Sequence, residues 1–155
     1  MKGAYVLIIE IPNELILDIK SIGRPTIDSG TYLYVGSAMG EGSTSLEKRI
    51  QRHFRQDKKL FWHIDYLLKE RATLKSVIWS ESLESVECEL AHGIKQIEDM
   101  LPGPRGFGST DCRSSCSTHL FCTNRTTALM KRVKEVFLHL GLTPLTTYDG
   151  RLQGT

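Results

Sequence analysis

The chain lacks the long hydrophobic segments that mark membrane and secreted proteins. None of its apolar runs approaches the roughly 18 residues of a membrane-spanning helix. The N-terminus lacks the basic flank, apolar core and small-residue cleavage site that together form a signal peptide. We therefore expect a cytoplasmic protein with no membrane partner.

Cysteines are also few, and the chain shows no internal repeat and no linker that would divide it. It has 4 cysteines in 155 residues and no CxxC pair. Hydrophobic residues make up 40% and charged residues 25%, the composition of a folded globular protein rather than a disordered one. This length suits one domain with a substantial core, so we expect residues 1–155 to form a single domain.

Hydrophobic patterning predicts an α+β fold. Strands are expected at Tyr5–Ile11, Tyr32–Ala38 and Leu74–Trp79, with a possible extra strand at Glu14–Ile19. Helices are expected at Thr44–Arg55, Phe61–Leu68, Glu81–Met100 and Thr127–Leu140. The first of these helices should begin with a capping box formed by Thr44 and Glu47.

These elements predict a small central sheet, mostly antiparallel, with three core strands and possibly a fourth, flanked by helices. The core should span about residues 3–100. Residues 101–155 should form a C-terminal extension, in which a cysteine-containing loop (Gly103–Thr118) precedes the last helix. The last dozen residues should be irregular.

Positive charge is concentrated in one short segment. This segment contains one acid, Asp57, and six basic residues: Lys48, Arg49, Arg52, Arg55, Lys58 and Lys59. Such a local excess favours binding to a polyanion such as nucleic acid. The alternative is a solvated helix face with a lysine-rich turn.

Two strand-like segments each carry a tyrosine close to a glycine. These segments are Gly3-Ala4-Tyr5 and Tyr34-Val35-Gly36. A tyrosine on a strand most often packs into the core with its hydroxyl at the rim. Gly36 lacks a Cβ atom, so a phosphate backbone can approach the strand there. Tyr32 lies two residues before Tyr34 and should face the same side of the strand.

The order of the two tyrosine segments, Arg49 and Glu87 resembles the GIY-YIG nuclease superfamily. Three further stretches resemble its DUF123 branch, whose members occur alone or fused to endonuclease III-type DNA glycosylases: residues 31–38, 62–68 and 106–112. The resemblance implies a metal-dependent endonuclease acting on DNA in repair or processing. It also implies a three-stranded sheet flanked by helices.

The resemblance assigns roles to individual side chains. Tyr34 would be the general base, and Tyr5 would contact the phosphate or the water. Arg49 would bind two phosphate oxygens, a contact suited to the planar guanidinium. His53, one helical turn later, would contact the scissile phosphate or transfer a proton. The alternative for His53 is an ordinary surface histidine.

The metal-binding carboxylate must be chosen among Glu84, Glu87 and Glu89. The expected helix has an apolar stripe that begins at Leu83 and ends at Leu101. Glu87 borders this stripe, whereas Glu89 points away and Glu84 lies further round. A carboxylate that faces the sheet needs a cation or an ionic partner. We therefore expect Glu87 to bind one Mg²⁺ or Mn²⁺ ion, with pairing to an arginine as the alternative.

Two further groups of residues remain open. Cys112, Cys116, His119 and Cys122 are zinc-ligand types with plausible spacing, although reduced cysteines without a metal are the alternative. Trp62 can stack on a base or belong to the core. Two other functions therefore stay in view: a binding module of the same fold without catalysis, and a zinc-stabilised interaction domain.

Overall fold

The computed structural model describes residues 1–155 except 111, 113–115 and 153–155. Its main sheet contains six antiparallel strands in the order β6-β7-β4-β1-β5-β8. These strands are β1 (Gly3–Ile11), β4 (Gly30–Ala38), β5 (Thr73–Glu81), β6 (Leu101–Pro102), β7 (Leu120–Thr123) and β8 (Leu145–Thr147). A separate two-stranded sheet joins β2 (Leu15–Ile16) to β3 (Thr26–Ile27).

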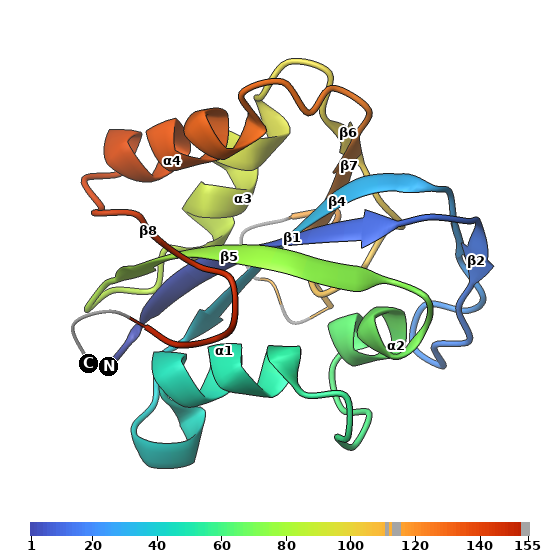
Figure 1. Cartoon of the computed structure of the whole chain (residues 1–155), viewed down its shortest axis with the longest axis horizontal. Coiled ribbons are helices and arrows are strands. Elements are labelled where there is room, and N and C mark those ends of the chain that lie inside the picture. The colour runs from blue at the N-terminus through green and yellow to red at the C-terminus, as the bar shows by residue number, and fades with distance from the viewer. Residues whose placement is uncertain (111, 113–115, 153–155) are drawn as a thin grey trace.

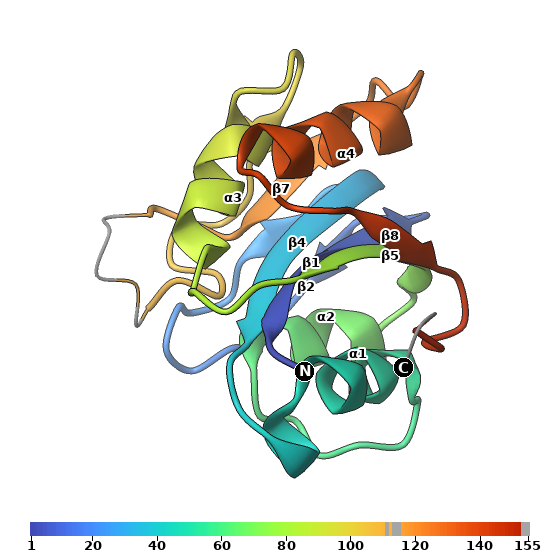
Figure 2. The same ribbon diagram turned by 90° about the vertical axis from the view of Figure 1, so that its left-hand side faces the viewer.

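Helices cover both faces of the main sheet. The helices α1 (Leu46–Phe54) and α2 (His63–Lys69) lie on one face, and α3 (Glu87–Lys95) and α4 (Leu129–His139) lie on the other (Figures 1 and 2). None of the helices in the described part of the chain is long and apolar enough to span a bilayer. The predicted α+β class with a mostly antiparallel sheet and flanking helices is confirmed.

The alternation of side chains along β1 explains how both faces of the sheet become buried. Tyr5, Leu7 and Ile9 point into the core shared with α1 and α2, whereas Val6 and Ile8 point into the core shared with α3 and α4. All five are buried, with at most 5% of their surface exposed. The continuous apolar run of this strand is therefore the pattern of a central strand covered on both sides.

The sheet is wider than expected because three short strands extend it at its two edges. The four residues of β7 pair with β4, and the two residues of β6 pair with β7. The three residues of β8 pair with the other edge, on β5, in the segment expected to be irregular. Strands this short are too short to show the alternation of apolar and polar residues that marks a strand in the sequence. They are stabilised by pairing with strands that are distant in the chain.

The start of α1 differs from the prediction. The N-cap of α1 is Ser45, whose Oγ accepts a hydrogen bond from Lys48 N at 3.4 Å, because Thr44 ends a short 3₁₀ helix (Gly42–Thr44). The carboxylate of Glu47 instead accepts a hydrogen bond from the N-terminal amine of Met1 at 2.6 Å.

The predicted long helix Glu81–Met100 is also wrong in extent, because only Glu87–Lys95 is α-helical. Leu83, expected on its apolar stripe, is 85% exposed. At the other end Asp99 has a positive φ of 64°, which a continuing helix does not permit.

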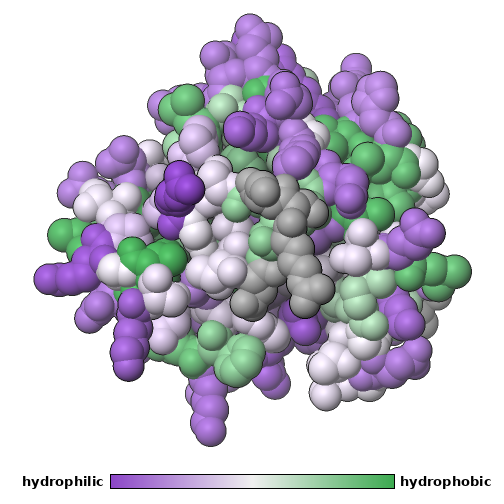
Figure 3. Space-filling model, turned by 180° about the vertical axis from the view of Figure 1, so that it is seen from behind, coloured by the Kyte–Doolittle hydropathy of each residue, from purple (hydrophilic) through white to green (hydrophobic). Residues whose placement is uncertain are grey.

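The face opposite the view of Figure 1 is mixed in polarity. Figure 3 shows hydrophobic side chains in small separate groups among hydrophilic ones. Large exposed apolar side chains are likewise spread along the chain rather than gathered in one segment, as Phe61, Leu83 and Tyr148 illustrate.

Candidate functional site

A polar cavity of about 260 Å³ opens at the end of the sheet where β1 begins and β4 ends. It is lined by Tyr5, Tyr34, Gly36, Ser37, Arg49, His53, Trp62, Ile64, Glu87, Gly108, Cys112 and His119. The five predicted catalytic residues are all in this set. They come from β1, β4, α1 and α3, so the fold brings together residues that are far apart in sequence.

The register of β1 and β4 places the two tyrosines side by side. Tyr5 pairs with Gly36 across the strands, and Tyr34 lies two residues before Gly36 on the same face. A Cβ atom on Gly36 would lie 2.5 Å from the Tyr5 hydroxyl. The space expected for a phosphate backbone at this glycine is therefore filled by the Tyr5 ring. Burial raises the pKa of both tyrosines.

A second glycine packs against Tyr34. A Cβ atom on Gly108 would lie 2.7 Å from the Tyr34 ring, and this glycine has a φ of +69°. The amide of Gly108 donates a hydrogen bond to His63 Nδ1 at 2.9 Å. His63, in the stretch 62–68 that resembles the DUF123 branch, thus holds the loop that covers Tyr34.

His53 is a buried partner of Tyr5 rather than a surface residue. The Tyr5 hydroxyl lies 2.8 Å from His53 Nε2, and His53 is only 3% exposed. Burial, followed by the positive charge of Lys58, lowers the pKa of His53 to about 3. The imidazole is therefore neutral at pH 7, and in one tautomer its Nε2 accepts the tyrosine proton.

Arg49 is held at the cavity by two contacts. Its Nη1 donates a hydrogen bond to the Ser37 carbonyl at 3.0 Å. Its guanidinium carbon lies 4.2 Å from the centre of the Trp62 ring, a cation–π contact. Trp62 is half-buried and orients this arginine.

Glu87 is the first residue of α3 and reaches the cavity from the opposite side of the sheet. Its Oε1 accepts a long hydrogen bond from Ser37 Oγ at 3.4 Å, and its Oε2 lies 3.7 Å from His119 Nδ1. Burial raises the pKa of the Glu87 carboxyl, while the Ser37 hydrogen bond and the charge of Arg49 act in the opposite direction. The position at a helix N-terminus also suits its negative charge.

Apart from Arg49, the basic segment between residues 48 and 59 has five basic residues, and two of them form hydrogen bonds within the protein. Arg52 donates to both carboxylate oxygens of the fully buried Asp65, at 2.8 and 2.9 Å. Lys58 Nζ donates to three carbonyls at the end of α1, those of Arg52, His53 and Arg55. Lys48, Arg55 and Lys59 are exposed. Of these five, only the three exposed residues have side chains directed to solvent.

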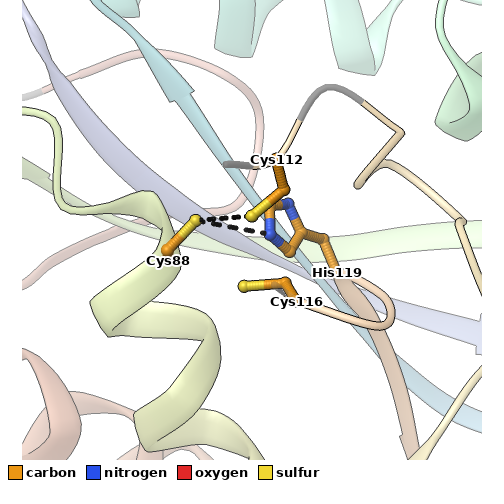
Figure 4. Close-up of side chains that lie close together, drawn as sticks. All are labelled: Cys88, Cys112, Cys116 and His119. Atoms are coloured by element: carbon orange, nitrogen blue, oxygen red, sulfur yellow. Dashed lines mark hydrogen bonds between the residues drawn. The ribbon is translucent and has the colours of Figure 1, made fainter. Parts of the chain in front are cut away.

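Figure 4 shows a cluster of sulfur and nitrogen ligands, two of which, Cys112 and His119, also line the cavity. Cys88, Cys112, Cys116 and His119 place their ligand atoms within 4.8 Å of one another. Such a set could hold a metal ion, and its thiols and imidazole suit Zn²⁺ better than Mg²⁺ or Mn²⁺. Burial, followed by the neighbouring thiols of Cys112 and Cys88, raises the pKa of the Cys116 thiol.

The fourth member of the predicted zinc set was wrong. Cys122 lies on β7 opposite Tyr32 and packs into the core on the α1 and α2 side. Cys122 lies on β7, and His119 directly precedes this strand. Because the two residues are three positions apart, their side chains point to opposite faces of the sheet. Cys88, on α3, takes the place expected for Cys122.

Comparison with family models gives one match, which covers residues 4–142 and is described as the domain of unknown function DUF123. The chain belongs to this family. No similarity to a curated protein or to a solved structure reached significance. The predicted membership of DUF123 is thus confirmed, whereas its place within the GIY-YIG superfamily stays a prediction.

Two features of this DUF123 chain had no clear signal in the sequence. Cys88 stands 24 residues before Cys112 in the chain, outside the short window in which ligand spacing is read. The position of Asp65 in the sequence indicates only a role at the start of α2. There its Oδ2 accepts hydrogen bonds from the Phe61 and Trp62 amides at 2.9 and 2.8 Å. Its pairing with Arg52 depends on the packing of α1 against α2.

Proposed function

We propose that this chain is an endonuclease-type domain that hydrolyses phosphodiester bonds in DNA with one divalent cation. One observation carries the proposal: the side chains selected by the resemblance line a single cavity. They are Tyr5, Tyr34, Arg49, His53 and Glu87. A phosphate bound there would meet a cation, a carboxylate and two phenols, which are the groups that phosphodiester hydrolysis requires.

Arg49 would bind the scissile phosphate. Its guanidinium is held by Ser37 and Trp62 and forms no ion pair with a carboxylate among the described residues. A guanidinium in this state can donate to two phosphate oxygens at once. Because Trp62 and Ser37 fix its orientation beforehand, little conformational entropy is lost on binding.

The Tyr5–His53 pair would move the proton of the attacking water. The Tyr5 hydroxyl would accept a proton from the water and at the same time donate its own proton to His53 Nε2. The phenol would therefore stay neutral, and the imidazole would become positively charged. This route suits a buried tyrosine whose raised pKa favours the protonated form. The negative phosphate would raise the basicity of His53. Tyr34, the base implied by the resemblance, would then orient the water or a phosphoryl oxygen.

Glu87 is the residue that would hold the divalent cation. A single carboxylate, completed by waters and phosphate oxygens, is a normal environment for Mg²⁺ or Mn²⁺, and Glu87 offers hard oxygen donors at the cavity. A bound cation would neutralise charge that develops on the phosphoryl oxygens. Ser37 and His119 keep the carboxylate directed toward the cavity.

The exposed residues Lys48, Arg55 and Lys59 would contact the DNA backbone on either side of the scissile bond. Arg52 and Lys58 would act indirectly, by holding α1 and the segment after it. A role in DNA repair or processing and a cytoplasmic location remain predictions from the sequence.

Cleavage of supercoiled plasmid and of branched or flap DNA, with Mg²⁺, with Mn²⁺ and with chelator, tests the proposal. The expected result is metal-dependent nicking that Tyr5→Phe lowers by about 10²–10⁴-fold, the usual range for loss of general acid–base catalysis. Tyr32→Phe is the matched control, because Tyr32 lies on the same face of β4 but its hydroxyl donates to the Asp28 carbonyl at 2.9 Å, outside the cavity.

The outcomes separate the alternatives. DNA binding without cleavage under either metal would support a binding module of the same fold. A nuclease in which Tyr5→Phe and Tyr34→Phe both cleave like the parent would place the active site elsewhere.

A further inference from the structure

The cysteine and histidine cluster connects three parts of the chain that are not neighbours in sequence. Cys88 lies in the first turn of α3, Cys112 and Cys116 belong to the loop between β6 and β7, and His119 directly precedes β7. The sulfurs of Cys88 and Cys112 are 3.0 Å apart, and the Cys88 sulfur is 4.0 Å from His119 Nε2 (Figure 4).

The geometry suits one tetrahedral ion. Zinc–sulfur bonds of about 2.3 Å and zinc–nitrogen bonds of about 2.0 Å place tetrahedral ligands roughly 3.5–4 Å apart. All four ligand atoms here lie within 4.8 Å of one another, so they reach this arrangement by small side-chain adjustments. Three sulfurs and one imidazole are a common structural zinc set, in which no position is left open for water.

The second nitrogen of His119 gives independent support. Its Nδ1 lies 3.7 Å from the Glu87 carboxylate and has no hydrogen-bond partner among the described residues, although the imidazole is only 1% exposed. A metal-binding histidine characteristically presents its other nitrogen to a carboxylate, which fixes the orientation of the ring. A small movement of Glu87 toward His119 completes this arrangement.

We propose that Cys88, Cys112, Cys116 and His119 bind one structural Zn²⁺ ion, and that this ion holds Glu87 at the cavity. The zinc joins the start of α3 to the loop and to β7. Glu87 precedes the ligand Cys88 in the chain and contacts the ligand His119, so its backbone and its side chain are both fixed by the same centre. The second part of this inference rests on the proposed function of Glu87, whereas the first part does not.

Metal analysis of the purified 155-residue chain tests the zinc site directly. The expected result is about one zinc per chain, as for other structural sites of this ligand type. Cys88→Ser should lose this zinc, whereas Cys122→Ser should keep it, because Cys122 lies on the other face of the sheet. Chelator should lower the Tm of the parent and of Cys122→Ser by at least about 5 °C.

A spectroscopic measurement keeps the test valid if Cys88→Ser does not fold. Replacement of zinc by Co²⁺ in the unaltered chain should give the intense visible bands of tetrahedral cobalt and a thiolate-to-cobalt charge-transfer band. His92→Ala should leave these bands unchanged: His92 Nε2 lies 3.6 Å from the Cys116 sulfur but is exposed at the edge of the cluster. Octahedral cobalt spectra, or an absence of bound metal, would overturn the proposal.

A disulfide between Cys88 and Cys112 is the competing outcome. Thiol alkylation followed by mass measurement, on protein purified without reductant, distinguishes the two states. The zinc site predicts that chelation makes three thiols newly reactive in the folded protein, while a mass lower by two hydrogens and no zinc would contradict it.

The two parts of the inference fail separately. Zinc bound by the cluster in a chain that cleaves no DNA would leave the zinc site intact and remove its link to catalysis. Cleavage by a chain that binds no zinc would overturn this inference and leave the proposed function standing. If zinc loss leaves cleavage unchanged while lowering Tm, the ion does not position Glu87.

Discussion

The ring of Tyr5 lies against the backbone of Gly36, and a Cβ atom at Gly36 would come within 2.5 Å of the phenol. Gly36→Ala should therefore push the Tyr5 ring out of place and break its hydrogen bond to His53. We expect a loss of about 1–3 kcal/mol in the free energy of unfolding, the usual cost of overpacking, together with reduced cleavage. Denaturant unfolding measures the first effect.

A double-mutant cycle isolates the cause. In a Tyr5→Leu background the phenol is absent, so the cost of adding the Gly36 methyl group should fall by at least half. An equal cost in both backgrounds would show that the glycine is required for another reason.

The ion pair between Arg52 and Asp65 should be a large contributor to stability. Asp65 is fully buried, and removal of its partner leaves an uncompensated charge. We expect Arg52→Met to lower the free energy of unfolding by about 3 kcal/mol, and by much less in an Asp65→Asn background. Burial acts to raise the pKa of Asp65, but hydrogen bonds from Arg52 and two amides outweigh it and lower the pKa.

The lowered pKa of Asp65 sets the direction of a pH effect. Its stabilisation is present above the carboxyl pKa of the unfolded chain and is lost as the pH falls toward the lower folded value. Asp65→Asn should therefore flatten the acid limb of the stability curve. A limb of unchanged slope in this variant would contradict the assignment.

His53 predicts a second pH effect at higher pH. The unfolded chain protonates this imidazole as the pH falls through about 6.5, whereas the folded chain resists protonation down to about 3. The unfolded state therefore binds more protons in this range. As the pH decreases, this group lowers the free energy of unfolding by up to about 1.4 kcal/mol per pH unit. His53→Asn should remove this slope, and denaturant unfolding at pH 7, 6 and 5 measures it. Parallel curves for the parent and the variant would contradict the buried neutral histidine.

Lys58 and Lys59 are neighbours with different expected effects on DNA binding. Lys59→Gln should weaken binding to all sequences and reduce the salt slope of the affinity by about one. Lys58→Gln should mainly destabilise the protein, because Lys58 donates to three carbonyls at the end of α1. Fluorescence anisotropy over a salt series measures both, and equal changes in salt slope would contradict this division.

The sequence predicted the central strands well because β1 and β4, each of nine residues, consist mainly of apolar residues and glycine. It missed β6, β7 and β8, whose two, four and three residues gain order only from the strands they pair with. Helix ends were less accurate, since the start of α1 depends on whether Thr44 or Ser45 takes the cap.

Glu87 lies at the cavity, although one premise of its prediction is wrong. The apolar stripe that selected it included Leu83, which is 85% exposed and outside the helix. Glu87 nevertheless lines the cavity, because it begins α3 beside the end of β4. The spatial link between Cys88 and the loop depends on tertiary packing and has no counterpart in local sequence.

We propose that the cavity is an active site in which Glu87 holds the essential cation. The most direct measurement is Mg²⁺-dependent DNA cleavage by Glu87→Gln beside Glu89→Gln, its exposed neighbour in the same turn of α3. We expect Glu87→Gln to lose cleavage by at least about 10²-fold while it keeps zinc and its fold, and Glu89→Gln to cleave like the parent. Equal cleavage by the two variants would contradict the role proposed for Glu87.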